Sequence, residues 1–135
     1  MEIRGDSYVI RYDEATAMLS LEGILRLYGA AGYFSIEDFN KHHDVLPTDA
    51  GSSYASIMEI FEFIVTQKLP HCVLNLRGLE LLNSSGINVL SKFVIKIREL
   101  HSTHLTIQGS QQFFWQSKVL QNLQKLMPGL NVEFD

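Results

Sequence analysis

Apolar and polar residues alternate near the N-terminus in the way that half-buried strands require. The segment from Ser7 to Tyr12 predicts one strand, and Leu19, Leu21, Leu25 and Leu27, with Gly23 among them, predict the buried face of a second. Asp13-Glu14 lies between these segments and predicts a turn. The sequence therefore predicts an N-terminal antiparallel hairpin.

The pattern becomes irregular between residues 29 and 50. Gly29-Ala30-Ala31-Gly32 interrupts it, lacks the third glycine of a nucleotide-binding loop, and predicts a turn or bulge. Ile36 to Pro47 is mostly polar and predicts a loop or one short helix. His42-His43-Asp44 has no recognised metal-ligand spacing, so we expect a solvated loop there and no metal site.

The rest of the chain alternates between helical periodicity and short apolar runs. The expected helices run from Ser52 or Ser53 to about Lys68, from Ser84 to His101 and from Phe113 to Met127, and the expected strands are Cys72 to Leu76, His104 to Gln108 and Leu130 to Phe134. In the middle helix the predicted apolar face holds Ile87, Leu90, Val94, Ile97 and His101, and the opposite face holds Asn88, Lys92, Lys96 and Glu99.

This order of elements predicts an α/β fold. Two strands followed by alternating helices and strands indicate a mixed, mainly parallel sheet with an N-terminal antiparallel hairpin and about three to four helices, placed mostly on one face. A chain of 135 residues fits one domain spanning residues 1–135.

Composition and charge exclude several classes of protein. The net charge is −4 and the cations are scattered, so no surface suited to nucleic acid is expected. Cys72 is the only cysteine, which fits a reducing compartment. No long apolar stretch predicts a signal peptide or a membrane span, so we expect a cytoplasmic protein.

The segment from Val73 to Leu90, VLNLRGLELLNSSGINVL, combines a buried strand, an expected short apolar loop, two hydroxyls and a helix start. The loop after a parallel strand borders the binding crevice of such sheets, and the helix that follows presents free N–H groups there. A phosphate on Ser84 would be favoured by the helix dipole while it adds charge to a neutral surface. The alternative is that Asn83, Ser84 or Ser85 is only an N-cap.

The run from Val73 to Glu99 resembles the STAS domain of anti-sigma factor antagonists, in which Ser-Ser-Gly links a strand to an amphipathic helix. The resemblance implies that Ser84, or alternatively Ser85, is phosphorylated by a partner serine/threonine kinase that is also the sequestering protein, and that a phosphatase removes the phosphate. It further implies partner contacts at Asn83, Ser85, Gly86, Asn88 and Lys92. Many members of the family have Asp where this chain has Asn83.

The expected function is therefore a phosphorylation-controlled partner switch in signal transduction or transcription regulation, without a cofactor and without enzyme activity. Ser84 and Ser85 lack the Gly-x-Ser-x-Gly context of a hydrolase. Two alternatives stay open: a sensor that binds a small anion or nucleotide, and a STAS-like activator of a signalling enzyme such as a diguanylate cyclase. Phe113, Phe114 and Trp115 cannot all face inward from one helix, so at least one is expected to face a partner.

Overall fold

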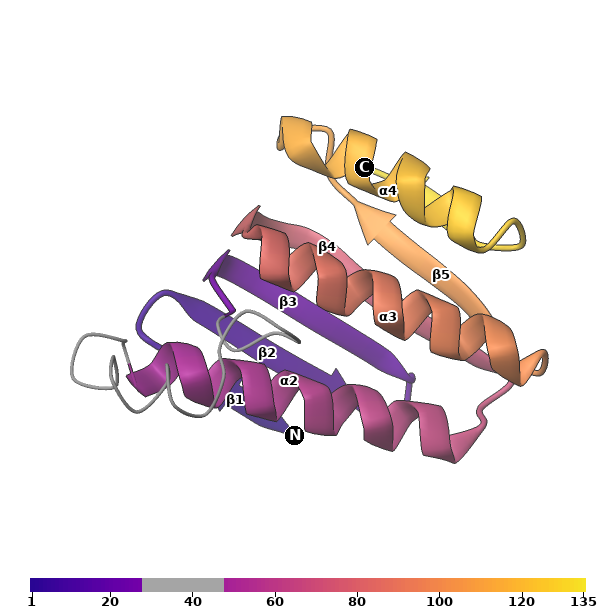
Figure 1. The fold of residues 1–135 in the computed structure, drawn as a ribbon, viewed down its shortest axis with the longest axis horizontal. Helices are drawn as coiled ribbons and strands as arrows, with labels where there is room; N and C mark the ends of the chain where they lie inside the picture. Colours follow the sequence, from indigo (N-terminus) through magenta and orange to yellow (C-terminus); the bar gives the residue numbers. More distant parts are fainter. Residues whose placement is uncertain (28–47) are drawn as a thin grey trace.

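The computed structural model describes residues 1–27 and 48–135, with side chains described for 1–27 and 55–135 (Figure 1). The turn expected at Gly29 to Gly32, the loop or short helix expected at Ile36 to Pro47, and His42-His43-Asp44 lie outside these residues.

The described residues form six strands and three helices. The strands are β1 (Glu2–Arg4), β2 (Tyr8–Asp13), β3 (Met18–Leu25), β4 (His71–Leu82), β5 (His104–Gly109) and β6 (Asn131–Phe134), and the helices are α2 (Thr48–Gln67), α3 (Ser84–Leu100) and α4 (Phe114–Leu126).

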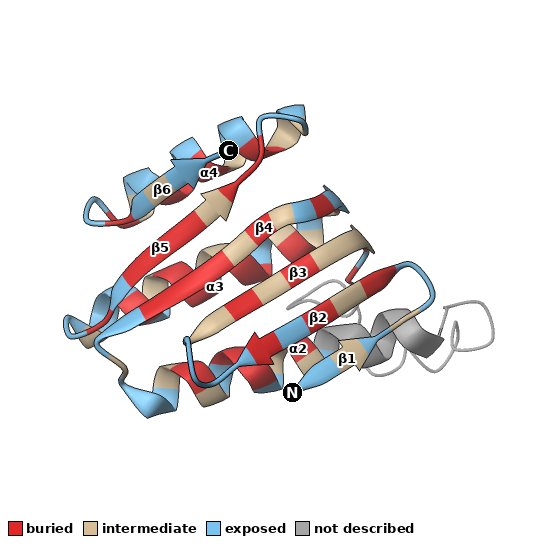
Figure 2. Cartoon of the chain, turned by 180° about the vertical axis from the view of Figure 1, so that it is seen from behind, coloured by how far each residue is buried: buried red, intermediate tan, exposed pale blue. Residues whose placement is uncertain are grey.

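The strands are arranged in one sheet in the order of the sequence, β1-β2-β3-β4-β5-β6. The pairs β1–β2 and β2–β3 are antiparallel, and the pairs from β3 to β6 are parallel. Right-handed crossovers that all move in one direction place their helices on one side. These pairings confirm the predicted α/β class with its N-terminal antiparallel hairpin. The helices α2, α3 and α4 all cover the same face of the sheet (Figures 1 and 2), as predicted.

The core lies between this face and the helices. Buried side chains come from the inward positions of the strands and from one stripe on each helix: Leu19, Leu21, Leu25 and Leu27 from β3 and its exit, Ile57, Ile60 and Ile64 from α2, and Leu90, Phe93, Val94 and Ile97 from α3. Phe61 of α2 stacks on Phe93 of α3 with ring centroids 4.2 Å apart. Each such side chain stabilises the fold by about 1.5–3 kcal/mol through burial.

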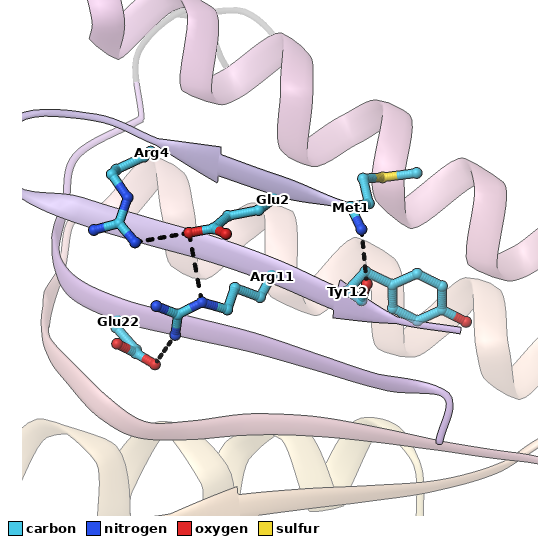
Figure 3. Close-up of polar contacts among 6 residues, drawn as sticks. All are labelled: Met1, Glu2, Arg4, Arg11, Tyr12 and Glu22. Atoms are coloured by element: carbon cyan, nitrogen blue, oxygen red, sulfur yellow. Dashed lines mark hydrogen bonds and ion pairs between the residues drawn. The ribbon is translucent and has the colours of Figure 1, made fainter. Parts of the chain in front are cut away.

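The opposite face of the sheet carries polar side chains near the hairpin (Figure 3). Glu2 accepts from Arg4 at 2.7 Å and lies 3.6 Å from Arg11, which also pairs with Glu22 at 2.8 Å. These pairs are exposed, so each contributes about 0–1 kcal/mol. They place charge on β1, an edge strand that sequence analysis did not predict, and charged edges resist pairing with other chains.

The strand β4 is longer than expected. It runs to Leu82, so the apolar loop predicted after Leu76 is wrong. The register with β3 shifts between Ser20 and Glu22 and again between Gly23 and Ile24. Such bulges break the alternation of inward and outward side chains. The order of apolar and polar residues in the second half of β4 therefore does not resemble that of a regular strand.

The second half of β4 does not pair with β5. The pairing between the two strands ends at Asn75, which lies opposite Gln108. Side chains of α4 replace that partner. Gln116 donates to the carbonyl groups of Leu76 and Leu79 at 2.7 and 2.9 Å, and the indole of Trp115 donates to the carbonyl of Glu80 at 2.9 Å. The end of β4 is thus held by β3 on one side and by α4 on the other.

Two helix boundaries differ from the prediction. The helix α2 begins at Thr48, so Ser52 and Ser53 lie inside it and neither is its cap. The helix α3 ends at Leu100, and His101 is its C-cap in the left-handed conformation with φ 58°. That turn removes His101 from the helical wheel, so its expected place on the apolar face is wrong and its side chain is exposed.

Candidate functional site

The candidate site is the junction between β4 and α3, where the Asn-Ser-Ser-Gly segment lies. The helix α3 begins at Ser84, as predicted, and Asn83 is its N-cap with extended φ and ψ of −77° and 174°. The side chain of Ser84 is exposed, that of Ser85 is half-buried, and Gly86 is buried. The junction therefore presents the first hydroxyl of the motif to solvent.

Asn83 has a structural role that its sequence context shows only in part. Its Oδ1 accepts a hydrogen bond from the N–H of Gly86 at 3.0 Å, which is the expected N-cap contact. The same oxygen accepts from the N–H of Leu27 at 3.1 Å, and Nδ2 donates to the carbonyl of Leu27 at 2.9 Å. Asn83 is half-buried and joins the start of α3 to the exit of β3.

Gly86 allows α3 to approach the end of β4. A Cβ atom at this position would lie 2.3 Å from Cδ1 and 2.7 Å from Cγ of Leu82, and 3.2 Å from Oδ1 of Asn83. Real Cβ atoms essentially never come within 3.0 Å of another atom, so a side chain at Gly86 would force either Leu82 or α3 to move. The glycine of the motif is needed for packing, and this role alone explains its presence here.

The exposed face of α3 continues from the first hydroxyl. Ser84, Asn88 and Lys92 are all exposed and follow one another at intervals of four residues, which places them on one face of the helix. Lys96 is the next member of this stripe and forms an ion pair with Glu62 of α2. The first turn of α3 has no acidic residue. The stripe is therefore neutral at its beginning and positive further along.

A hollow of about 450 Å³ between α2 and α3 borders the basic end of this stripe. Met58, Phe61 and Phe93 contribute apolar surface to it, while Glu62, Lys92 and Lys96 contribute charge. A protein that contacted the exposed face of α3 could therefore also reach apolar surface at its edge.

The structure brings together all the residues that sequence analysis predicted for the site. Asn83, Ser84, Ser85 and Gly86 form the junction, and Asn88 and Lys92 extend it along the exposed face of α3. What sequence analysis missed is the backbone of Leu27, which is distant in the sequence and which no motif marks.

A second exposed feature lies at the start of α4. The side chain of Phe114 is 93 % exposed, so the expectation that one of the three consecutive aromatic residues faces outward is correct. Phe113, Phe114 and Phe134 line a hollow of about 270 Å³. That a partner contacts this aromatic surface stays a prediction.

Comparison of the chain with protein-family models, with curated proteins and with solved structures finds no match. The similarity to STAS domains therefore stays a prediction from the motif and the order of elements. Among the described residues, no helix is long and apolar enough to cross a membrane. No group of three or more potential metal-ligating side chains occurs in residues 1–27 and 55–135.

Proposed function

We propose that this chain is a partner-switching regulator of the anti-sigma factor antagonist type. The unmodified surface formed by Ser84, Asn88 and Lys92 binds a serine/threonine kinase that resembles an anti-sigma factor. The kinase phosphorylates Ser84, the complex dissociates, and a matching phosphatase restores the unmodified form. The protein acts by binding and does not itself catalyse a reaction.

The observation that carries this proposal is the position of one exposed hydroxyl at the first residue of α3, at the head of an exposed helical stripe. A phosphate there adds about −1.5 to −2 charges at neutral pH. The N-terminal dipole of α3 favours an anion at this point, so the fold can tolerate the modification. A partner packed on the same stripe would have to desolvate that charge, and this cost favours dissociation.

The proposal is tested first by mass spectrometry of the protein isolated from its native cells. Cleavage after Arg77 and Lys92 releases a peptide that contains Ser84, Ser85 and Ser91. Fragmentation then assigns the modified hydroxyl, and we expect one phosphate on Ser84. Persistent absence of phosphate on this peptide under varied growth conditions would contradict the proposal.

Partner binding is tested with charge variants used as bait in the same cells. We expect a serine kinase to co-purify with the native chain and with Ser84→Ala, and to be lost with Ser84→Asp. Ser102→Asp is the matched control, because it places the same charge on an exposed serine just beyond the C-terminal end of α3 and should keep the kinase. Equal recovery with Ser84→Ala and Ser84→Asp would contradict the proposal.

A further inference from the structure

Two histidines lie next to each other on the face of the sheet opposite the helices, the face turned toward the viewer in Figure 2. His71 and His104 are the first residues of β4 and β5, and the parallel register places them directly opposite each other. Their ring centroids are 6.2 Å apart, and the ring planes differ by 20°. Both histidines are exposed, whereas the next residue of each strand, Cys72 and Leu105, is buried in the core. Successive side chains of a strand point to opposite faces, so both imidazoles point away from the helices.

Two polar side chains lie beside this pair on the same face. Nε2 of His71 lies 3.5 Å from Oγ1 of Thr106, which follows His104 by two residues on β5. Thr106 is buried, and its Oγ1 accepts a hydrogen bond from Nδ2 of Asn131 on β6 at 3.4 Å. A histidine that binds a metal ion through one ring nitrogen almost always donates a hydrogen bond from the other. Because a hydroxyl oxygen has two lone pairs, Thr106 can accept that bond as well.

We propose that His71 and His104 together bind a divalent transition-metal ion of the kind that prefers imidazole, namely Zn²⁺, Ni²⁺ or Cu²⁺. An imidazole nitrogen binds Zn²⁺ at about 2.0–2.1 Å, so two such nitrogens on one tetrahedral ion are about 3.4 Å apart. Nitrogens of two rings with centroids 6.2 Å apart come near this spacing once the rings turn toward each other. Both side chains are exposed, so rotation about χ1 and χ2 can bring about this change.

The two ring nitrogens of His71 have different roles in this site. Nε2–H donates to Thr106, which leaves the lone pair of Nδ1 for the ion. The pair supplies two of the four ligands of a tetrahedral ion, so water occupies the other positions and the ion exchanges with solvent. Ser84 follows the other end of β4, a strand of 12 residues that is about 40 Å long. The metal site is therefore independent of the proposed phosphorylation.

The test is calorimetric titration of the full chain, without a histidine tag, with ZnCl₂. His71→Ala and His104→Ala each remove one ligand and should weaken Zn²⁺ binding by at least about tenfold, since even the loss of a ligand's hydrogen-bond partner has an effect of this size. The chain has three further histidines, which serve as controls. A variant with both His42→Ala and His43→Ala, and the variant His101→Asn, keep the pair and should bind Zn²⁺ as the native chain does. MgCl₂ should not compete, because Mg²⁺ prefers oxygen ligands.

Thr106→Val tests the hydrogen bond that positions His71. Valine suits a strand and removes the hydroxyl, while neither side chain touches the ion. We expect Zn²⁺ binding to weaken by about tenfold, as it does when a metal-binding histidine loses its hydrogen-bond partner. A merely structural role of Thr106 would change the stability of the chain but not the affinity of the folded chain for Zn²⁺. Unchanged affinity would show that Thr106 does not position His71.

The imidazole signals of the native chain locate the ion without any substitution, so this measurement decides the question even if a variant does not fold. In nitrogen-15 NMR spectra, Zn²⁺ should shift the ring signals of His71 and His104 and leave that of His101 unchanged. Three results would overturn the inference: no binding of Zn²⁺ by the native chain, shifts confined to His42 and His43, or unchanged affinity in either His71→Ala or His104→Ala.

Discussion

Gln116 is the polar side chain on which the end of β4 depends most. It is fully buried, with a relative exposure of 0 %. Its Oε1 accepts from the N–H of Ser110 at 2.8 Å, and its Nε2 donates to the carbonyl groups of Leu76 and Leu79. Replacement by methionine keeps similar length and volume, so Gln116→Met removes the hydrogen bonds without opening a large cavity.

The expected cost follows from the three backbone groups that lose their partner. A buried polar group without a hydrogen bond costs about 1–3 kcal/mol. The two carbonyl groups and one N–H together therefore predict a decrease of at least about 3 kcal/mol in the free energy of unfolding. Since the total free energy of unfolding of such domains is about 5–15 kcal/mol, the variant should be strongly destabilised.

Urea denaturation measures this difference, with far-ultraviolet circular dichroism and the fluorescence of Trp115, the only tryptophan, as independent probes. Coincident transitions and an unchanged m-value would show that the native state itself has lost stability. Gln121→Met is the matched control, because Gln121 lies exposed on the same helix, and its effect should stay within about 0.5 kcal/mol. A loss of less than about 1 kcal/mol in Gln116→Met would refute the reasoning, since even one unsatisfied group should cost that much.

Two further predictions concern the core and the helix junction. Burial raises the pKa of Cys72 from its ordinary 9.0 to about 11. This difference in pKa contributes about 2–3 kcal/mol to the free energy of unfolding below about pH 9. The contribution is lost between about pH 9 and 11, because the thiol of the unfolded chain releases its proton first. Urea unfolding at pH 8 and 10.5 should show most of this loss, about 2 kcal/mol, and the loss should be smaller in Cys72→Ala. Gly86→Ala should lower the free energy of unfolding by about 1–3 kcal/mol through the clash with Leu82. Gly129→Ala, with no atom within 4 Å of the new Cβ, should have no such effect in the same assay.

The sequence predicts those parts of the fold whose residues interact with near neighbours. The apolar stripe of α3 repeats with helical period, and Leu90, Val94 and Ile97 are buried as expected. The second half of β4 was wrongly predicted to be a loop, because its bulges disturb the alternation and because its partners on α4 are distant in sequence. The strand β1 was missed, since three residues on an exposed edge carry almost no hydrophobic signal.

In the candidate site, too, the local features could be predicted from the sequence and the contacts between distant residues could not. The start of α3 at Ser84 follows from residue type and from the beginning of the helical pattern, which left the N-cap open among Asn83, Ser84 and Ser85; the structure assigns it to Asn83. The bonds between Asn83 and Leu27 join residues separated by 56 positions, and asparagine is common in turns for many other reasons. Sequence reasoning therefore identified the junction between β4 and α3 as the candidate site, but not the contacts between Asn83 and Leu27.

The sequential strand order has a consequence for how the chain folds. Among the described strands, none has to be inserted between two strands that are already paired, because each new strand is added at the free edge of the sheet. From β3 onward, each helix and its following strand form one unit that docks on the unit synthesised before it. The contact order is therefore low for a parallel sheet, and this favours fast folding. A nascent chain leaving the ribosome could build its sheet from β1 toward β6 without rearranging any earlier pair.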